Sequence, residues 1–212
     1  DEYDKRLGIK DYWGYESFNN PVGNGQVEKS KGNFVYQQED ITLPSSELEF
    51  GITRTYNSQS SAKTAFGNGW DHNFNLEILR VCNSNGQQVD SYVYKDGSGT
   101  IEHLSKQTDG SYLSDGTKEL HLYESKDAKG EILELEDEQE ISWKYRLEDK
   151  SQKNWYFNSS GQVIAITEPT GTWMLLHYDE KQGMLSYVEA STGKELKFTY
   201  QDASQGDHLL VK

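Results

Sequence analysis

The sequence lacks the short histidine, serine and glycine motifs that mark common catalytic, phosphate-binding and zinc-binding sites. The five histidines form no HxxxH or HExxH pair, so their spacing predicts no zinc site. They are His72, His103, His121, His177 and His208. No G-x-S-x-G, GxxxxGKS/T or GxGxxG motif occurs, which removes the nucleophile elbow and the phosphate-binding loops. A single cysteine, Cys82, cannot form an intrachain disulfide or a cysteine-built metal site. We therefore expect no catalytic, cofactor-binding or metal-binding residues.

Carboxylates alternate in one stretch of the sequence, at Glu134, Glu136, Glu138 and Glu140. A glycoside hydrolase needs two carboxyl groups at a set separation across a cleft, and calcium favours clustered oxygen ligands. The sequence lacks the D-x-D/N-x-D/N-G calcium loop. A strand of alternating glutamates is typical of a solvated edge that resists edge-to-edge pairing. The stretch is therefore interpreted as an acidic edge rather than as a hydrolase or calcium site.

Aromatic residues suggest either a core or a binding surface. Sugars stack on exposed indole rings, so five tryptophans keep open the alternative of a carbohydrate-binding domain. They are Trp13, Trp70, Trp143, Trp155 and Trp173. Large aromatics also form the core of a thin sheet, and this packing role is the preferred interpretation. Arg54 lies in the strand pattern Thr53-Arg54-Thr55-Tyr56, where a stacked or carboxylate-paired structural role is expected.

Charge and composition limit the partners and the core. Among 212 residues, 21 Lys and Arg stand against 35 Asp and Glu, for a net charge of −14. An acidic surface repels phosphate backbones and anionic lipids, which disfavours nucleic acid as a partner and a membrane-surface role. The longest strongly apolar run, Trp173–Leu176, is far shorter than the roughly 20 residues of a membrane span. With 33% apolar residues, we expect a sheet with one wet face rather than a multilayer core.

Strand patterns and turn dipeptides dominate from Phe34 onward and predict an all-β fold of antiparallel hairpins. Residues 34–43 and 48–58 have the pattern of strands, the second with Phe50 and Ile52 on one face. Turn dipeptides that end in glycine then recur, at Gly86, Gly97, Gly110, Gly116 and Gly130. Residues 1–33 have no sustained period and are interpreted as an irregular aromatic-rich lead-in. The β domain is predicted to cover residues 34–212.

The last third of the chain repeats itself with a period near 22 residues. An aromatic residue recurs at Phe157, Tyr178 and Tyr200, and a turn glycine follows each one, at Gly161, Gly183 and Gly206. Residues 116–135 are similar to residues 193–211, so the repeats are clearest in 116–135 and 157–212. Such a period indicates one hairpin per repeat, whose apolar face is buried only when neighbouring repeats stack.

Two groups of motifs resemble the Rhs and teneurin proteins. The unit Tyr178-Asp179-x-x-x-Gly183-x-Leu185 resembles their YD repeat, and two further copies carry Asn158 and Gln201 instead of aspartate. Residues 31–78 resemble the segment that opens the Rhs shell, with G-N-F, D-I, R-x-Y-N-S and G-x-G-W-x-x-N-F in that order. The matching residues are Gly32, Asn33, Phe34, Asp40, Ile41, Arg54, Tyr56, Asn57, Ser58, Gly67, Gly69, Trp70, Asn73 and Phe74. LGIKDYWGYESF (residues 7–18) resembles the lead-in of Gram-positive members.

This resemblance implies a structural role. In that family many YD repeats coil as a long β-sheet into a hollow shell, which in bacterial members commonly encloses a C-terminal toxin. Many members are secreted or wall-associated. The family's Asp-Pro-rich boundary motif, linked to self-cleavage, is absent from this chain, as is an initiator methionine. We therefore expect a piece of a longer protein, from the N-terminal part of the YD-repeat region.

The sequence thus predicts a structural segment of a bacterial Rhs-type shell protein, secreted or on the cell surface, and not an enzyme. Its expected partners are the remainder of its own chain, with further YD repeats and a toxin cargo. The alternative is a cell-surface carbohydrate-binding β domain with a glycan partner. An uncovered sheet edge also predicts dimerisation through edge strands. The residues expected to pack or turn are Arg54, Tyr56, Gly67, Gly69, Trp70, Phe157, Gly161, Tyr178, Gly183 and Tyr200.

Overall fold

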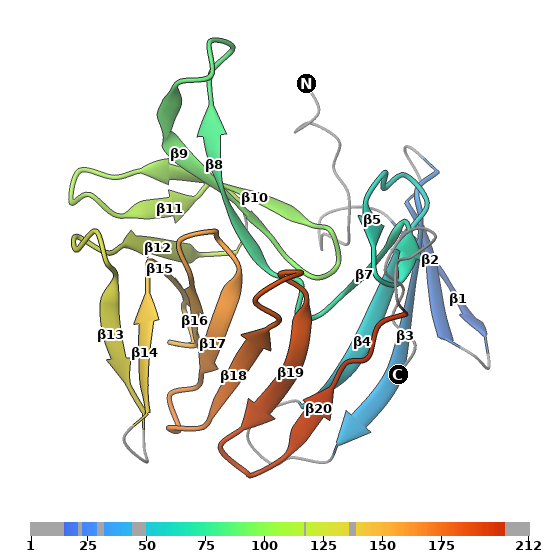
Figure 1. Ribbon diagram of the computed structural model, residues 1–212. Helices are drawn as coiled ribbons and strands as arrows, with labels where there is room; N and C mark the ends of the chain where they lie inside the picture. Colours follow the sequence, from blue (N-terminus) through green and yellow to red (C-terminus); the bar gives the residue numbers. More distant parts are fainter. Residues whose placement is uncertain are drawn as a thin grey trace. The chain divides into compact units, whose positions relative to one another are not determined.

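The computed structural model describes residues 15–20, 23–28, 32–43, 50–116, 118–135 and 139–201, which form strands and turns (Figure 1). The predicted all-β fold of antiparallel hairpins is confirmed. None of these residues belongs to a helix with the length and apolarity that a membrane crossing requires. The chain divides into two compact units. Unit 1 takes the described residues up to 75 with 96–101 and 196–201, and unit 2 takes 76–95 and the described residues of 102–195.

Unit 1 is built on an antiparallel sheet in the order β1-β2-β3-β4-β7. Its strands are β1 (Tyr15–Asn20), β2 (Gly23–Glu28), β3 (Phe34–Leu43), β4 (Phe50–Asn57) and β7 (Trp70–His72), and a small hairpin joins β5 (Lys63–Thr64) to β6 (Gly67–Asn68). Val35, Phe50 and Ile52 are almost fully buried in this unit. The predicted strands at 34–43 and 48–58 correspond to β3 and β4.

The structure differs from the expected irregular lead-in between residues 15 and 28. These residues form β1 and β2, and β2 pairs with β3 from Asn24↔Gln37 to Val27↔Phe34. Glycine and asparagine hide the local signal of a strand, and the hydrogen bonds that hold β2 come from a strand farther along the chain. The rest of the predicted lead-in lies outside the described residues.

The larger sheet is a meander in which neighbouring strands are mostly neighbours in the sequence, and its residues belong to unit 2 apart from Ile101, Leu196 and Lys197. The sheet runs β20-β19-β18-β17-β16-β15-β12-β11-β10-β9-β8. The strands are β8 (Glu77–Cys82), β9 (Gln88–Lys95), β10 (Ile101–Lys106), β11 (Tyr112–Ser114), β12 (Leu120–Glu124), β15 (Tyr145–Asp149), β16 (Asn154–Phe157), β17 (Val163–Thr167), β18 (Trp173–Tyr178), β19 (Leu185–Ala190) and β20 (Glu195–Lys197). The separate hairpin of β13 (Glu131–Glu134) and β14 (Glu140–Trp143) is inserted between β12 and β15.

The inner face of unit 2 is the apolar face of this sheet. Leu122 pairs with Leu147, and Tyr145 pairs with Phe157, so the four side chains stand on one face. All are between 0% and 2% exposed. The inner face also holds Leu104, Val163, Leu176 and Val188. These side chains form the core of unit 2.

The sheet of unit 2 curls until its first strand meets a strand far along the sheet order. The Ile78 amide donates to the Gly161 carbonyl at 2.8 Å, and the Val163 amide donates to the Leu76 carbonyl at 3.3 Å. Gly161 has a φ of +83°, and a Cβ atom there would lie 2.0 Å from the Ile78 carbonyl oxygen. Only glycine therefore allows β8 to approach the turn between β16 and β17.

The outer face of unit 2 is covered over β16, β17 and β18. Leu133, Leu135 and Ile141 from the β13–β14 hairpin region pack against a cluster of Trp143, Tyr156, Ala165, Trp173 and Leu175. Trp173, Met174, Leu175 and Leu176 are all buried, which requires cover on both faces of β18. The expectation of one wet face is therefore wrong for this part of the sheet.

The contact at Gly161 can be tested with a matched glycine. Gly171 also has a positive φ, +90°, but a Cβ atom there would meet open space, with no other part of the chain within 4 Å. We expect Gly171→Ala to lower the free energy of unfolding by about 1 kcal/mol, the cost of the left-handed backbone. Gly161→Ala should cost about 3 kcal/mol or more, because the strands must also separate. Urea unfolding of both variants measures the difference, and equal losses would contradict this role of Gly161.

Candidate functional site

Three of the sequence motifs meet at one end of the unit 1 sheet. The Ser58 hydroxyl donates to the Asn33 side-chain oxygen at 3.2 Å and accepts from the Phe34 amide at 2.9 Å. The Asn57 amide donates to the Gly69 carbonyl at 2.8 Å. Asn33 and Asn57 are 1% and 3% exposed. The G-N-F, Y-N-S and G-x-G-W motifs therefore form one buried polar junction that joins β3, β4 and the turn before β7.

An aromatic surface extends from this junction across β3, β4 and β7. We call it the aromatic face, and its side chains are half-buried: Phe34, Tyr36, Tyr56, Phe66, Trp70 and His72. The Trp70 ring lies 5.4 Å from the Tyr56 ring and 6.2 Å from the Tyr36 ring, centroid to centroid. Such pairs stabilise a sheet through offset and edge-to-face contacts. The structure thus brings Tyr56 and Trp70 together, as their predicted packing role requires.

Arg54 covers the indole of Trp70 on this face. Its Cζ atom lies 4.9 Å from the Trp70 ring centroid. The guanidinium also donates to both carboxylate oxygens of Asp40, from Nε and from Nη2, the latter at 2.7 Å. A bidentate arginine held in this way is both stacked and carboxylate-paired. Arg54 therefore covers one face of the Trp70 ring.

The two predicted turn glycines of unit 1 lie beside Trp70. Gly67 has a φ of +106° and Gly69 a φ of +75°. A Cβ atom at Gly69 would be 3.0 Å from both the Asn57 carbonyl oxygen and the Tyr56 ring. Gly69 thus lets the chain pass close to β4 and place Trp70 opposite Tyr56 in the strand register.

The repeat residues of unit 2 form a shared turn. The Asp179 carboxylate accepts from the amides of Lys181 and Gln182 at 3.0 and 2.8 Å, and the Gly183 amide donates to the Asp179 carbonyl at 2.8 Å. Asn158 does the same in the preceding copy, where its side-chain oxygen accepts from Ser160 and Gln162. Because the contact needs only a side-chain oxygen at this distance, Asn158 replaces the aspartate of the repeat without loss.

The aromatic residues of the repeats join neighbouring hairpins. The Tyr178 hydroxyl donates to the Val163 carbonyl at 2.7 Å, which links the second repeat to the strand of the first. Phe157 is fully buried, with its ring 6.4 Å from that of Tyr94. Tyr200, in the last copy, is half-buried, and burial raises its pKa to about 12. The rest of that copy lies outside the described residues.

Each described tryptophan is either buried or has a cation close to its ring. Trp143 and Trp173 are 7% and 6% exposed. The Lys153 ammonium lies 5.5 Å from the Trp155 ring centroid, and Arg54 lies on Trp70. Trp13 is outside the described residues. The geometry favours the packing interpretation of these tryptophans.

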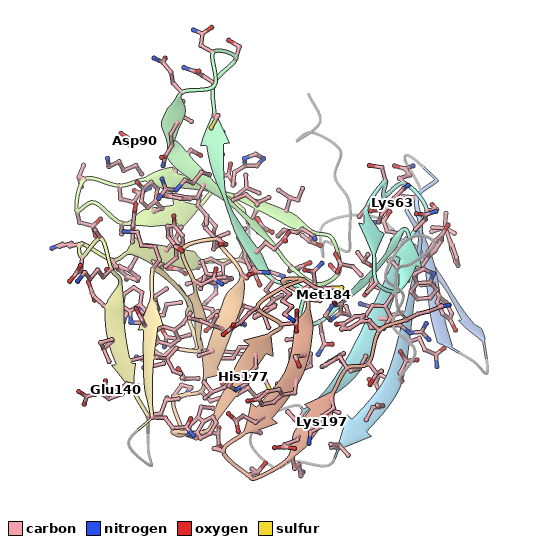
Figure 2. The ribbon with its side chains drawn as sticks, viewed as in Figure 1. Lys63, Asp90, Glu140, His177, Met184 and Lys197 are labelled. Atoms are coloured by element: carbon pink, nitrogen blue, oxygen red, sulfur yellow. The ribbon has the colours of Figure 1, made fainter. Side chains whose placement is uncertain are left out.

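The described members of the alternating glutamates and of the histidines lie on different strands. Glu134 pairs with Glu140 across the β13–β14 hairpin, and Glu140 lies at the end of β14 (Figure 2). Glu136, Glu138 and His208 lie outside the described residues. His177 on β18 meets the Glu189 carboxylate at 2.8 Å and stacks on Tyr187 with ring centroids 4.0 Å apart (Figure 2). Within the described ranges no group of three or more His, Cys, Asp and Glu side chains could hold a metal ion.

One polar network was missed by sequence reasoning. Glu124 stands on the inner face of unit 2, where it accepts from the Tyr92 hydroxyl at 2.7 Å. Arg80 and Lys144 reach the same carboxylate at 3.6 and 3.4 Å, and Arg80 also donates to the Tyr145 hydroxyl at 2.9 Å. Burial, with the bond to Glu124, raises the pKa of Tyr92, so its phenol stays protonated and donates. The only sequence signal is a charged residue at an inward position of the LHLYE strand.

Comparison with known proteins adds two findings. The family described as "Domain of unknown function (DUF6531)" matches residues 24–104, which include the whole aromatic face. The chain is also 26% identical over 155 residues to "tRNA nuclease WapA" of Bacillus subtilis, "tRNA(Glu)-specific nuclease WapA" of Bacillus subtilis subsp. natto and "tRNA3(Ser)-specific nuclease WapA" of Bacillus spizizenii. These alignments cover 73% of this chain but 6% of each relative.

The relatives correct one expectation. The sequence predicted that the chain is not an enzyme, and that prediction is contradicted because all three relatives are named as nucleases. That prediction rested on the absence of short catalytic motifs. Such motifs describe only particular reaction classes, so their absence does not exclude an enzyme. The matched part of each relative is 6% of its length, so the chain spans only a small fraction of the nucleases that it matches.

Removal of the Trp70 side chain tests the packing role of the aromatic face. Because Trp70 is half-buried, we expect Trp70→Ala to cost about 2 kcal/mol and to lower the Tm by about 5 °C. Trp70→Phe keeps a ring under Arg54 and should lose less than half as much. Thermal unfolding followed by circular dichroism measures both variants. An unchanged Tm in Trp70→Ala would show that this ring does not support the sheet.

Alkaline unfolding tests the burial of Tyr200. A tyrosine in the unfolded chain titrates near 10, whereas the folded pKa of Tyr200 is about 12. As pH rises above about 10, the unfolded chain loses its proton first and holds fewer protons than the folded one, so stability falls. Tyr200→Phe should therefore show a shallower loss of unfolding free energy between pH 9 and 11 than the wild type. Urea unfolding across that range, with pH 7 as the reference, decides it, and identical slopes would refute the burial.

Proposed function

We propose that this chain is an opening structural segment of a toxin-related bacterial protein of the Rhs/YD-repeat type. In this role it begins a β-shell that houses or presents an effector carried elsewhere in the same protein. Its partners are then the remaining repeats and the effector, and its place is secreted or on the cell surface. An uncovered edge strand would allow pairing with the next part of the chain or with a second copy.

The observation that carries this proposal is the shared hairpin of unit 2. Two successive copies use an Asx side chain to form the turn, a turn glycine, and an aromatic residue at the strand end. Gln162 of one turn also donates to the Gly183 carbonyl of the next at 3.1 Å, so the turns stack. A hairpin that docks on its predecessor in this way can be added repeatedly, which a growing shell requires.

The comparisons with known proteins also support this proposal. The family match spans the motifs that meet at the polar junction of unit 1, and the relatives are nucleases many times longer than this chain. The shell role explains why a segment of a toxin can be rich in hairpins and hydrogen-bonded turns. The proposal concerns only the position of this chain in such a protein. The activity of the effector belongs to the parent protein as a whole.

The first test is the intact mass of the native parent protein, with sequencing of its C-terminal peptides. The proposal expects a mass far above that of a 212-residue chain and further Tyr-Asp…Gly repeats downstream. A native protein of about this length, without such repeats, would overturn it.

A second test uses the parent protein with substitutions in this segment. Gly161→Ala should open unit 2 and increase the rate at which trypsin releases the downstream effector. Gly171→Ala, with the same backbone conformation but open space around it, is the matched control and should release little more than the wild type. Equal release from the wild type and both variants would refute a housing role for this segment.

A further inference from the structure

A hollow opens at one end of the inner face of unit 2. It has a volume of about 430 Å³, within the size range of small-molecule sites. Nine residues from the β10–β11 hairpin and the end of β12 line it: Lys106, Asp109, Gly110, Ser111, Tyr112, Tyr123, Glu124, Ser125 and Lys126. Asp90 on β9, labelled in Figure 2, pairs with Lys106 at 3.1 Å beside this lining.

The inner part of the hollow is held in place by contacts of its own. Tyr112 is 6% exposed and stands edge-on to Tyr92, with ring centroids 4.7 Å apart. The Glu124 carboxylate is bound by Tyr92 and by two cations, as described above. Lys144 also donates to the Ser125 carbonyl at 3.0 Å. These contacts hold this part of the lining in place, and the Glu124 carboxylate already has two cations beside it.

Two lining charges have no such balance. Asp109 accepts from the Ser111 amide at 2.9 Å and from the Ser111 hydroxyl at 2.6 Å, and its one further electrostatic interaction in the described residues is a weaker one with His121. Both bonds hold the pKa of Asp109 below its usual range, so it is a carboxylate at neutral pH. Lys126 makes no ion pair within the described residues. One anion and one cation therefore remain for a ligand.

We propose that this hollow binds a small dipolar molecule, which carries one ammonium group and one carboxylate, as an amino acid or a short peptide does. A simple anion would meet Lys126 but also the Asp109 carboxylate, and a simple cation would meet Asp109 but also Lys126. A ligand with both charges satisfies Asp109 and Lys126 together, while the Tyr112 ring in the lining provides apolar contact. This site is independent of the shell proposal.

Titration of the 212-residue chain with the dipeptide alanyl-alanine tests the proposal. The backbone amide signals of Gly110 and Ser111 in nuclear magnetic resonance spectra report binding at the hollow. Three related probes separate the chemistry: N-acetylalanine has no ammonium group, alaninamide has no carboxylate, and glucose has no charge. We expect saturable shifts with alanyl-alanine, and affinities at least about tenfold weaker for each of the other three.

Two exposed substitutions locate the site without disturbing the fold. Asp109→Asn keeps a side-chain oxygen for Ser111, and Lys126→Gln keeps a long polar side chain, yet each removes one charge. Each should weaken alanyl-alanine binding about tenfold, whereas Lys181→Gln, an exposed lysine at a different turn, should leave it unchanged. Equal binding of N-acetylalanine or alaninamide, tighter binding of glucose, or no response to any probe would each overturn the proposal.

Discussion

The structure of unit 2 depends on one place where two backbones touch. β8 is separated from β17 by six strands in the sheet order, yet the amides and carbonyls of Leu76, Ile78, Gly161 and Val163 bond directly. This contact turns an open antiparallel sheet into one that curls over its own inner face. A sheet that buries its inner face against itself needs no second layer on that side. The low apolar content of the chain therefore suffices for a core of fully buried leucine, valine and aromatic side chains.

The hydrogen bonds of asparagine and aspartate side chains set the ends of the strands in both units. In unit 2, Asp179, Asn158 and Asp149 bond the amides two to four residues ahead. In unit 1, the side-chain oxygen of Asn33 instead bonds a residue 25 positions away. The first kind of contact makes a turn, and the second joins strands that the turn has separated. A chain with few apolar residues thus relies on side-chain amides and carboxylates for strand register.

Sequence patterns predicted the features that depend on contacts between residues close together in the chain. Alternation and glycine turns indicated β3, β4 and the hairpins of unit 2, and the position of Arg54 inside a strand pattern indicated its stacked, paired role. The approach of Ile78 to Gly161 could not be predicted, because the two residues are far apart in sequence and share no pattern. The cover on the outer face was also hidden. Leu133, Leu135 and Ile141 lie among glutamates, so the stretch looked like a solvated edge although its apolar side chains pack on Trp143 and Trp173.

The hollow of unit 2 follows from the same alternation that builds its core. Leu120, Leu122 and Glu124 stand on one face of β12, so the apolar row ends in a carboxylate. The fully buried Tyr92 requires an acceptor for its hydroxyl, and Glu124 supplies it. Arg80 and Lys144 also lie beside that half-exposed carboxylate. The apolar row of β12 therefore ends in a hydrogen-bonded carboxylate rather than in a further leucine, and this polar group lines the hollow.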